Sequence, residues 1–246
     1  MPLKASPDAQ SQLLELQAID TRLRQLDHSM KTVPELAILA ELAAGSGVVQ
    51  HEAMSVSGSL EDVKLELGRV EADVAVVEAR IARDVERLES SSSVKDVAGL
   101  ESELLGLRNR QGELEDIQLE LMEQAEGFEA QLAQLHANAE EVHAKIAAAE
   151  TERDSALAAL GSERAHSVAT RSVIVGTLPA ELVALYERQR DRYGFGASHL
   201  RGGVSSASGL KLNESDMADV RAAAPDDVLL CPDSNAILVR TSESGL

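Results

Sequence analysis

Apolar residues recur every seven positions from Leu100 to Leu160 of this 246-residue chain. One column of this heptad repeat is apolar throughout: Leu100, Leu107, Leu114, Leu121, Phe128, Leu135, Val142, Ala149 and Ala156. A second column, four residues on, is weaker because it includes Gln111, Gln118 and Arg153. Columns that repeat every 3.5 residues on average stay on one face only where a helix winds around another helix. The pattern therefore predicts a coiled coil.

The partner helix is expected in the same chain. A second seam holds Leu60, Val63, Leu67, Val70, Val74, Val77, Ile81 and Leu88, with Asp84 as its polar exception. An earlier seam holds Leu16, Ile19, Leu23, Leu26, Met30 and Val33. Between the two long seams, residues 89–96 contain four consecutive serines, whose side chains compete for backbone hydrogen bonds and favour a turn. The fold class expected is mainly α: a long antiparallel coiled-coil hairpin that bends near 89–96, with a small C-terminal module.

The first arm of the hairpin has helix-breaking residues. Pro34 interrupts it, and Gly45, Gly47 and Gly58 follow among serines. The apolar registers on the two sides of this stretch are out of phase. We therefore expect a kink or a frayed segment there.

Composition favours an elongated body over a large globular core. The chain has two Phe, two Tyr and no Trp, whereas a narrow Leu/Val/Ala seam needs no aromatic residues. No apolar run is expected to reach the roughly 20 residues of a membrane span, and the N-terminus lacks the apolar stretch of a secretory signal. We expect a cytoplasmic protein. Cys231, the single cysteine, excludes an intrachain disulfide.

The C-terminal region is predicted to form a small α+β module. Pro179 and Gly194 delimit a short helix over 180–193, and a second helix over 214–223 is expected to be capped by Asn213 or Ser215. Residues 209–213 alternate as a short strand. Two apolar runs, 228–231 and 236–239, predict a β-hairpin. We expect a coiled-coil hairpin over 1–163, a neck over 164–200 and the module over 201–246.

This order of parts resembles bacterial proteins that join a coiled-coil hairpin to a C-terminal zinc ribbon with four cysteine ligands. The likeness rests on four segments: Leu210–Leu212, Asp219–Asp227, Leu230–Pro232 and Ile237–Arg240. It implies a ribbon-like module and an adaptor or chaperone role. Members of that family are associated with flagellar or secretion assembly and with an alternative sigma factor, and one binds messenger RNA.

At the implied ligand positions this chain departs from that family. They fall at Ser205, Ser208, Cys231 and Ser234, so serine replaces three of the four thiolates. A serine hydroxyl is a poor zinc ligand because it is not ionised near neutral pH. His199 is near in sequence, but one His and one Cys do not make a tetrahedral site. We expect a zinc-free ribbon and no cofactor, with Cys231 as a buried strand residue in preference to a remnant ligand or redox thiol.

Charge changes sign along the chain. Residues 1–163 hold 14 Lys/Arg against 32 Asp/Glu, whereas residues 164–212 hold seven Lys/Arg against three acidic residues. The anion or nucleic-acid contacts that follow from this are Arg188, Arg190, Arg192, Arg201 and Lys211. Spacing by two spreads the first three around a helix, which favours a solvated neck helix over a phosphate-binding stripe.

No catalytic pattern is present in the sequence. His136 and His143 are seven apart and share one helix face, but a solvated face explains them better than a metal or catalytic pair. Phosphate-binding loops and nucleophile elbows are absent from the sequence. The sequence thus indicates a non-enzymatic adaptor or scaffold that presents the knob to unidentified protein partners. RNA binding through the basic neck and knob is the alternative.

Overall fold

The computed structural model describes residues 3–246, which form a mainly helical chain with one small sheet. The helices are α1 (Pro7–Lys31), α2 (Pro34–Ser90), α3 (Val94–Thr177), α4 (Ala180–Tyr193) and α5 (Glu214–Ala222); the strands are β1 (Ala197–Arg201), β2 (Val204–Ser205), β3 (Leu229–Leu230) and β4 (Ile237–Val239). Contacts divide the chain into two compact units. We call residues 35–151 the hairpin unit, and residues 3–34 with 152–246 the terminal unit.

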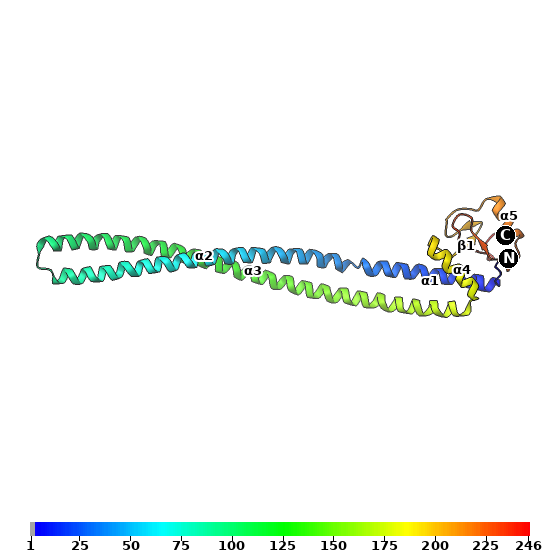
Figure 1. Ribbon diagram of the computed structural model, residues 1–246, viewed down its shortest axis with the longest axis horizontal. Coiled ribbons are helices and arrows are strands. Elements are labelled where there is room, and N and C mark those ends of the chain that lie inside the picture. The colour runs from blue at the N-terminus through cyan, green and yellow to red at the C-terminus, as the bar shows by residue number, and fades with distance from the viewer. Residues whose placement is uncertain (1–2) are drawn as a thin grey trace. The chain divides into compact units, whose positions relative to one another are not determined.

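In the hairpin unit, α2 and α3 run antiparallel, side by side (Figure 1). The bend occupies residues 91–93, which confirms the turn predicted near 89–96. The Ser93 hydroxyl accepts the backbone N–H of Asp96 at 3.4 Å and so caps the start of α3. Between the arms, Lys64 pairs with Glu129 at 2.7 Å, and Arg80 pairs with Glu103.

The heptad seams are confirmed by burial. Leu60 and Val70 on α2 and Leu100, Leu104 and Leu114 on α3 are buried, and the remaining predicted seam positions of this unit are buried or half-buried. Asp84 is also buried, at 5% exposure. Its Oδ1 lies 3.4 Å from Arg87, whereas its Oδ2 has no hydrogen-bond partner in the described part of the chain. The seam therefore contains one carboxylate that packing alone would not favour.

The prediction of a kink or frayed segment around Gly45–Gly58 is wrong. Helix α2 continues from Pro34 to Ser90 without interruption, and a Cβ built at Gly45, Gly47 or Gly58 meets nothing within 4 Å. Each glycine weakens a helix by only about 1 kcal/mol, so a long paired helix tolerates them. The expected break does occur at Pro34, which is the first residue of α2 after α1 has ended at Lys31.

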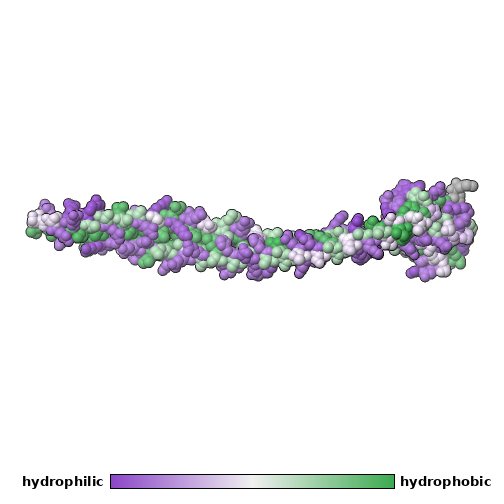
Figure 2. Space-filling model, turned by 90° about the horizontal axis from the view of Figure 1, so that it is seen from below, coloured by the Kyte–Doolittle hydropathy of each residue, from purple (hydrophilic) through white to green (hydrophobic). Residues whose placement is uncertain are grey.

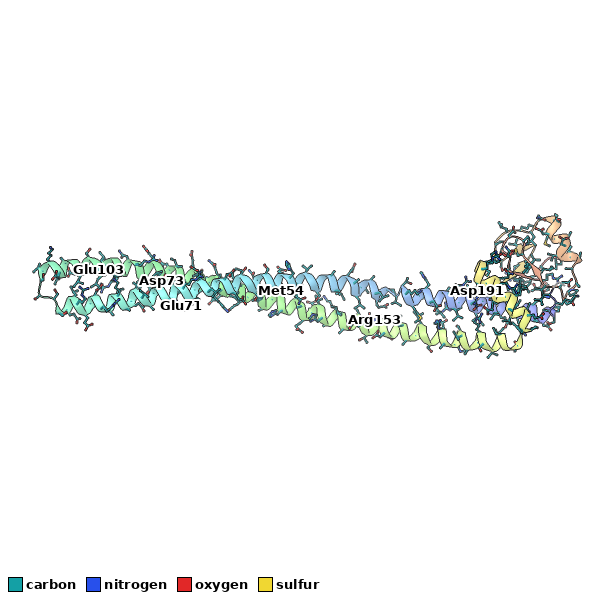
Figure 3. All side chains as sticks on the ribbon, viewed as in Figure 1. Met54, Glu71, Asp73, Glu103, Arg153 and Asp191 are labelled. Carbon is teal, nitrogen blue, oxygen red and sulfur yellow. The ribbon has the colours of Figure 1, made fainter. Side chains whose placement is uncertain are left out.

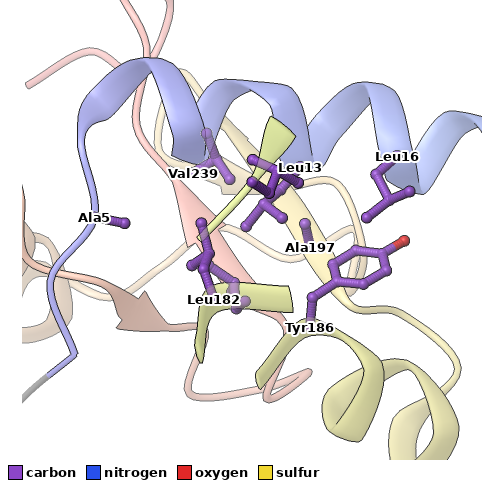
Figure 4. Packing of buried hydrophobic residues seen from close by; sticks show 9 residues of the cluster. Ala5, Leu13, Leu16, Leu182, Tyr186, Ala197 and Val239 are labelled. Atoms are coloured by element: carbon purple, nitrogen blue, oxygen red, sulfur yellow. The ribbon is translucent and has the colours of Figure 1, made fainter. Parts of the chain in front are cut away.

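The terminal unit is built on a four-stranded sheet of order β2-β1-β4-β3, in which β1 and β4 are parallel and the other pairs are antiparallel. Ile237 and Val239 of β4 face one hydrophobic cluster, and Leu238 faces the other. The first cluster, which includes Leu13 and Leu16 of α1 and Leu182 and Tyr186 of α4, is shown in Figure 4. The second contains Met217 and Val220 of α5. The sheet is thus covered by α1 and α4 on one face and by α5 on the other.

Several C-terminal elements match the prediction and others do not. Helices α4 and α5 and the β3–β4 hairpin are confirmed, with Gly194 in the left-handed conformation (φ 85°) and the Asn213 side chain capping α5 at 2.8 Å. The strand predicted over 209–213 is wrong, since only one isolated bridge, Val204 to Lys211, forms there. Strand β1 lies instead in the predicted neck. The boundary predicted at residue 163 falls inside α3, which continues to Thr177.

Candidate functional site

Asp20 is the centre of a buried polar cluster that joins three helices of the terminal unit. Its side chain, 6% exposed, accepts hydrogen bonds from Arg171 on α3 at 2.7 and 3.3 Å. Arg190 and the Tyr186 hydroxyl, both on α4, donate to the same carboxylate at 3.1 and 2.8 Å. Glu187 pairs with both arginines, so two carboxylates and two guanidinium groups neutralise one another.

These hydrogen bonds decide the ionisation of the cluster. Burial opposes the charged form of Asp20, but donors from Arg171, Tyr186 and Arg190 outweigh it, so the pKa of Asp20 lies below its ordinary value. Burial and the Asp20 carboxylate raise the pKa of the Tyr186 hydroxyl well above its ordinary range. The cluster therefore holds an ionised Asp20 and a neutral Tyr186 beside two guanidinium cations and Glu187, which fits a structural joint between three helices.

A second polar residue of α1 fixes the entry to the sheet. The side-chain oxygen of Gln17 accepts the backbone N–H groups of Gly196 at 2.8 Å and Ala197 at 3.2 Å, at the start of β1. Gln10, one heptad earlier, donates to the carbonyl oxygen of Ala5 at 2.9 Å. Sequence reasoning missed this role of α1. The available signal was polar residues at seven-residue spacing on the same face as Leu13 and Leu16.

A cavity of about 510 Å³ lies beside this cluster. Its charged lining residues are Asp20, Arg24, Asp27, Arg164, Arg171, Arg190 and Asp191. Arg164 pairs with Asp27 at 2.7 Å, and the Arg24 guanidinium lies over the Phe195 ring, 5.3 Å from its centroid. The positive charges are thus largely matched by carboxylates or an aromatic face.

The five predicted anion contacts do not converge. Arg190 is bonded within the Asp20 cluster, and Arg201 pairs with Glu243 at 2.7 Å. Arg188 and Arg192 are exposed on α4, and Arg192 lies over the Tyr193 ring. Lys211 is exposed beyond β2. Nucleic-acid binding through these five residues stays a prediction, because Arg190 and Arg201 are already paired with carboxylates.

Ser205, Ser208, Cys231 and Ser234, the ligand positions that the zinc-ribbon resemblance implies, lie on two loops with the same hydrogen-bond pattern. In the first loop, the N–H of Gly209 donates to the carbonyl of Ser205 at 2.8 Å, and in the second Asn235 donates to Cys231 at the same distance. Gly209 and Asn235 both have positive φ, 71° and 55°. This conformation is common for glycine and accessible to asparagine, so the two loops bend in the same way.

A serine in each loop accepts a hydrogen bond from the backbone N–H two residues further along the chain. The hydroxyl of Ser208 accepts the N–H of Leu210 at 3.2 Å, and that of Ser234 accepts the N–H of Ala236 at 3.4 Å. The first residues of the two loops meet, because the Cys231 thiol donates to the Ser205 hydroxyl at 3.3 Å. The fold thus brings two loops together, and each carries two of these side chains three residues apart: Ser205 and Ser208 in one loop, Cys231 and Ser234 in the other.

The donor set of these loops does not fit zinc. It offers one thiol and three hydroxyls, and the Ser205 hydroxyl is already hydrogen-bonded to Ser198 at 2.7 Å. Burial opposes ionisation of Cys231, but its hydrogen bonds with Ser205, Ser234 and the loop backbone outweigh burial and lower the pKa of the thiol. Cys231 is fully buried in the second hydrophobic cluster.

Other metal-binding groupings are also absent from the described residues. Within 3–246, no cluster of three or more His, Cys, Asp or Glu side chains is placed to hold a metal ion. His199, considered above as a substitute ligand, has its Nε2 2.8 Å from the Thr241 hydroxyl.

Residues 16–194, which span the paired helices and α4, match the CT398-like coiled coil hairpin domain. The chain belongs to this family. Uncharacterized protein Rv2229c of Mycobacterium tuberculosis is 33% identical to it over 239 residues, covering 97% of this chain and 98% of the relative. The match to the CT398-like family ends before β1, so the C-terminal sheet and its loops lie outside it, and the zinc-ribbon resemblance stays a prediction.

Solved structures agree with this assignment. A Mycobacterium smegmatis protein is similar at a TM-score of 0.88 and 32% identity, covering 97% of this chain and 100% of that one. CT398 from Chlamydia trachomatis is similar at a TM-score of 0.67 and 19% identity, covering 94% and 97%, which shows a shared fold. Both similarities extend over nearly the whole of this chain and so include most of the small C-terminal sheet region.

Proposed function

We propose that this protein is a non-enzymatic cytoplasmic adaptor or scaffold, in which the hairpin unit and a zinc-free ribbon present surfaces to protein partners. The observation that carries the proposal is apolar exposure outside the seam. On α2, Val48, Met54, Leu65 and Val76 are each more than 60% exposed, and on α3 Leu105 is 63% exposed. A two-helix coil buries one stripe per helix, so side chains of this kind on other faces favour contact with a further protein.

The surface colouring agrees with this interpretation. Figure 2 shows hydrophobic patches interspersed with hydrophilic ones along the paired helices. Contrary to the sequence expectation, an 18-residue window within Pro7–Ser90 is apolar enough for a membrane span, with a mean hydropathy of 1.4. Only 6% of this window is buried. Length and composition are the only grounds for a span there, and the same exposed apolar residues suit a protein interface.

The ribbon part of the proposal is supported by the paired loops. Their matching backbone hydrogen bonds are those expected of a ribbon whose loops keep their shape without a metal. In place of a bound metal, the loops are held by the packing of Cys231 in the second hydrophobic cluster. A ribbon stabilised in this way serves as a stable recognition surface.

The proposal is tested by purifying the tagged full-length chain from its own bacterium and identifying proteins retained in stoichiometric amount. Reciprocal tagging should recover this chain, and cross-linking should place the partner on the hairpin unit or on the ribbon. Recovery of a lone chain under mild conditions, or of RNA whose retention disappears steeply with salt, would contradict the adaptor role and favour the nucleic-acid alternative.

A further inference from the structure

An apolar groove lies along the two helices of the hairpin unit. It has a volume of about 430 Å³. Its apolar lining comes from Val49, Ala53 and Met54 of α2 and from Leu132, Leu135 and Ala139 of α3, and its polar lining is Ser46, Gln50, Ser57, His136 and His143. Ala53 and Ala139 both line it, and two alanines do not fill the space that a pair of leucines fills in a coiled coil. The groove belongs wholly to residues 46–143.

No side chain of the described chain covers this part of α2. Val48 is 66% exposed and Met54 62% exposed, and Figure 3 marks Met54 on α2. A Cβ at Gly47 would have open space around it. The stretch 36–51 holds Glu41 as its only Asp, Glu, Lys or Arg. A partner helix can therefore approach the α2 backbone closely and bury its own apolar residues there.

Acidic residues outnumber basic ones around the groove. Residues 35–63 contain five Asp or Glu and no Lys or Arg, and residues 127–150 of the opposite arm contain four Glu and a single Lys145. Lys145 is paired with Glu141 at 2.7 Å, four residues away on the same helix, and Lys64, which follows the first stretch, is paired with Glu129 at 2.7 Å. The acidic residues therefore remain in excess. An apolar groove with an acidic rim attracts a cationic partner and repels an anionic one.

We propose that this groove binds a cationic amphipathic helix of a protein partner, an inference that rests on the adaptor function above. The partner's apolar residues, at i, i+3, i+4 and i+7, occupy the groove beside Val49, Met54 and Leu135, and its Lys and Arg residues face the acidic rim. A second copy of this chain is disfavoured as the occupant because two acidic rims would face each other. Anionic lipid and nucleic acid are disfavoured for the same reason.

The test uses the full-length protein and two labelled helical peptides of 18 residues. One has a leucine face and a lysine face, and the other has the same leucines with glutamate in place of lysine. Fluorescence anisotropy should show that the lysine peptide binds at least tenfold more tightly than the glutamate peptide, and that its affinity falls as salt is raised. A scrambled lysine peptide without an apolar face should lose most of the affinity.

Two matched variants locate the site. Met54→Lys places a charge at the groove, and Val76→Lys places the same charge at an equally exposed apolar position of α2. Met54→Lys should lower the affinity for the lysine peptide at least tenfold, whereas Val76→Lys should lower it less than twofold. Both positions are exposed, so neither substitution should unfold α2, which circular dichroism checks. Equal effects of the two variants, or equal binding of the two peptides, would overturn the inference.

Other occupants give distinct results. A dimer of the full-length protein in analytical ultracentrifugation that dissociates in Met54→Lys but persists in Val76→Lys would show a second copy in the groove and overturn the inference. Binding to phosphatidylglycerol vesicles abolished by Met54→Lys would overturn it in favour of lipid. If Met54→Lys retains the co-purifying partners of the wild type, the adaptor function stands and the groove inference fails; if the wild type retains none, the adaptor function itself fails.

Discussion

The Asp20 carboxylate accepts the Nε–H of Arg171, 151 residues further along the chain, at 2.7 Å. This contact joins the first helix of the protein to the last turns of α3, and Tyr186 and Arg190 add the third helix to the same carboxylate. The N-terminal helix is thereby part of the terminal unit, and its apolar face completes one hydrophobic cluster of the sheet. The terminal unit therefore depends on residues from both ends of the sequence.

Loss of the Asp20 carboxylate should destabilise the terminal unit strongly. Asp20→Asn leaves two partly buried arginines with less compensation, and we expect a loss of roughly 3 kcal/mol in the free energy of unfolding. Asp27→Asn is the control, because the Asp27–Arg164 pair is about half exposed and contributes less than about 1 kcal/mol. Both tyrosines lie in this unit, so tyrosine fluorescence during urea unfolding reports on it. Equal losses in the two variants would contradict the role of Asp20.

The same carboxylate should make stability depend on pH. The pKa of Asp20 is lowered in the folded state, so its contribution is fully present above the unfolded-state value of about 3.9 and is lost as pH falls through the folded-state value. The difference in unfolding free energy between wild type and Asp20→Asn should be constant from pH 7 to about pH 5 and then shrink with acidification. Urea titrations at pH 7, 5, 4 and 3 measure it. A difference that does not shrink would contradict the assignment.

Removal of the buried seam carboxylate should stabilise the hairpin unit. Asp84 is 5% exposed, and one of its oxygens has no hydrogen-bond partner among the described residues. Asp84→Leu completes the apolar seam and should raise stability by about 1 to 3 kcal/mol. Hydrogen exchange of peptides from α2 near the bend measures the gain. Glu86→Leu, at an exposed position two residues on, serves as the control and should leave the exchange rates nearly unchanged.

Two glycines should respond oppositely to the same substitution. A Cβ at Gly196 would overlap the buried ring of Tyr186, approaching ring atoms to 2.7 Å or less, so Gly196→Ala should destabilise the terminal unit by about 1 to 3 kcal/mol. Gly106 lies within α3 with open space around it, so Gly106→Ala should stabilise the helix by up to about 1 kcal/mol. Thermal unfolding followed by circular dichroism and tyrosine fluorescence separates the two. Destabilisation by both would contradict the packing described.

The paired loops should accept zinc once their thiolates are supplied. We expect purified wild type to contain no stoichiometric zinc, and the triple variant Ser205→Cys, Ser208→Cys, Ser234→Cys to bind one zinc per chain together with Cys231. Metal analysis measures the stoichiometry, and cobalt substitution shows thiolate coordination in the absorption spectrum. One zinc per wild-type chain would refute the prediction that the module is free of zinc. A triple variant that stays folded and binds none would show that the loops lack ribbon geometry.

Local patterns in the sequence determined most of the helical architecture. The heptad columns of α2 and α3, the serine bend, Pro179 and Gly194 around α4 and Asn213 before α5 each act within a few turns of chain. Their periodicity and capping chemistry therefore predict them directly. The prediction at Gly45–Gly58 failed because the low helix propensity of glycine, about 1 kcal/mol per residue, is outweighed by the packing of a long helix against its partner helix.

Only the tertiary structure decided which distant segments meet. The parallel pairing of β1 with β4, the packing of α1 on the sheet and the groove beside Met54 all join residues well separated in sequence. Such contacts depend on complementary shape and on satisfying buried polar groups, and neither leaves a periodic trace along the chain. Asp20 illustrates the difference: its position on α1 follows from the sequence, whereas its three partners are set by packing.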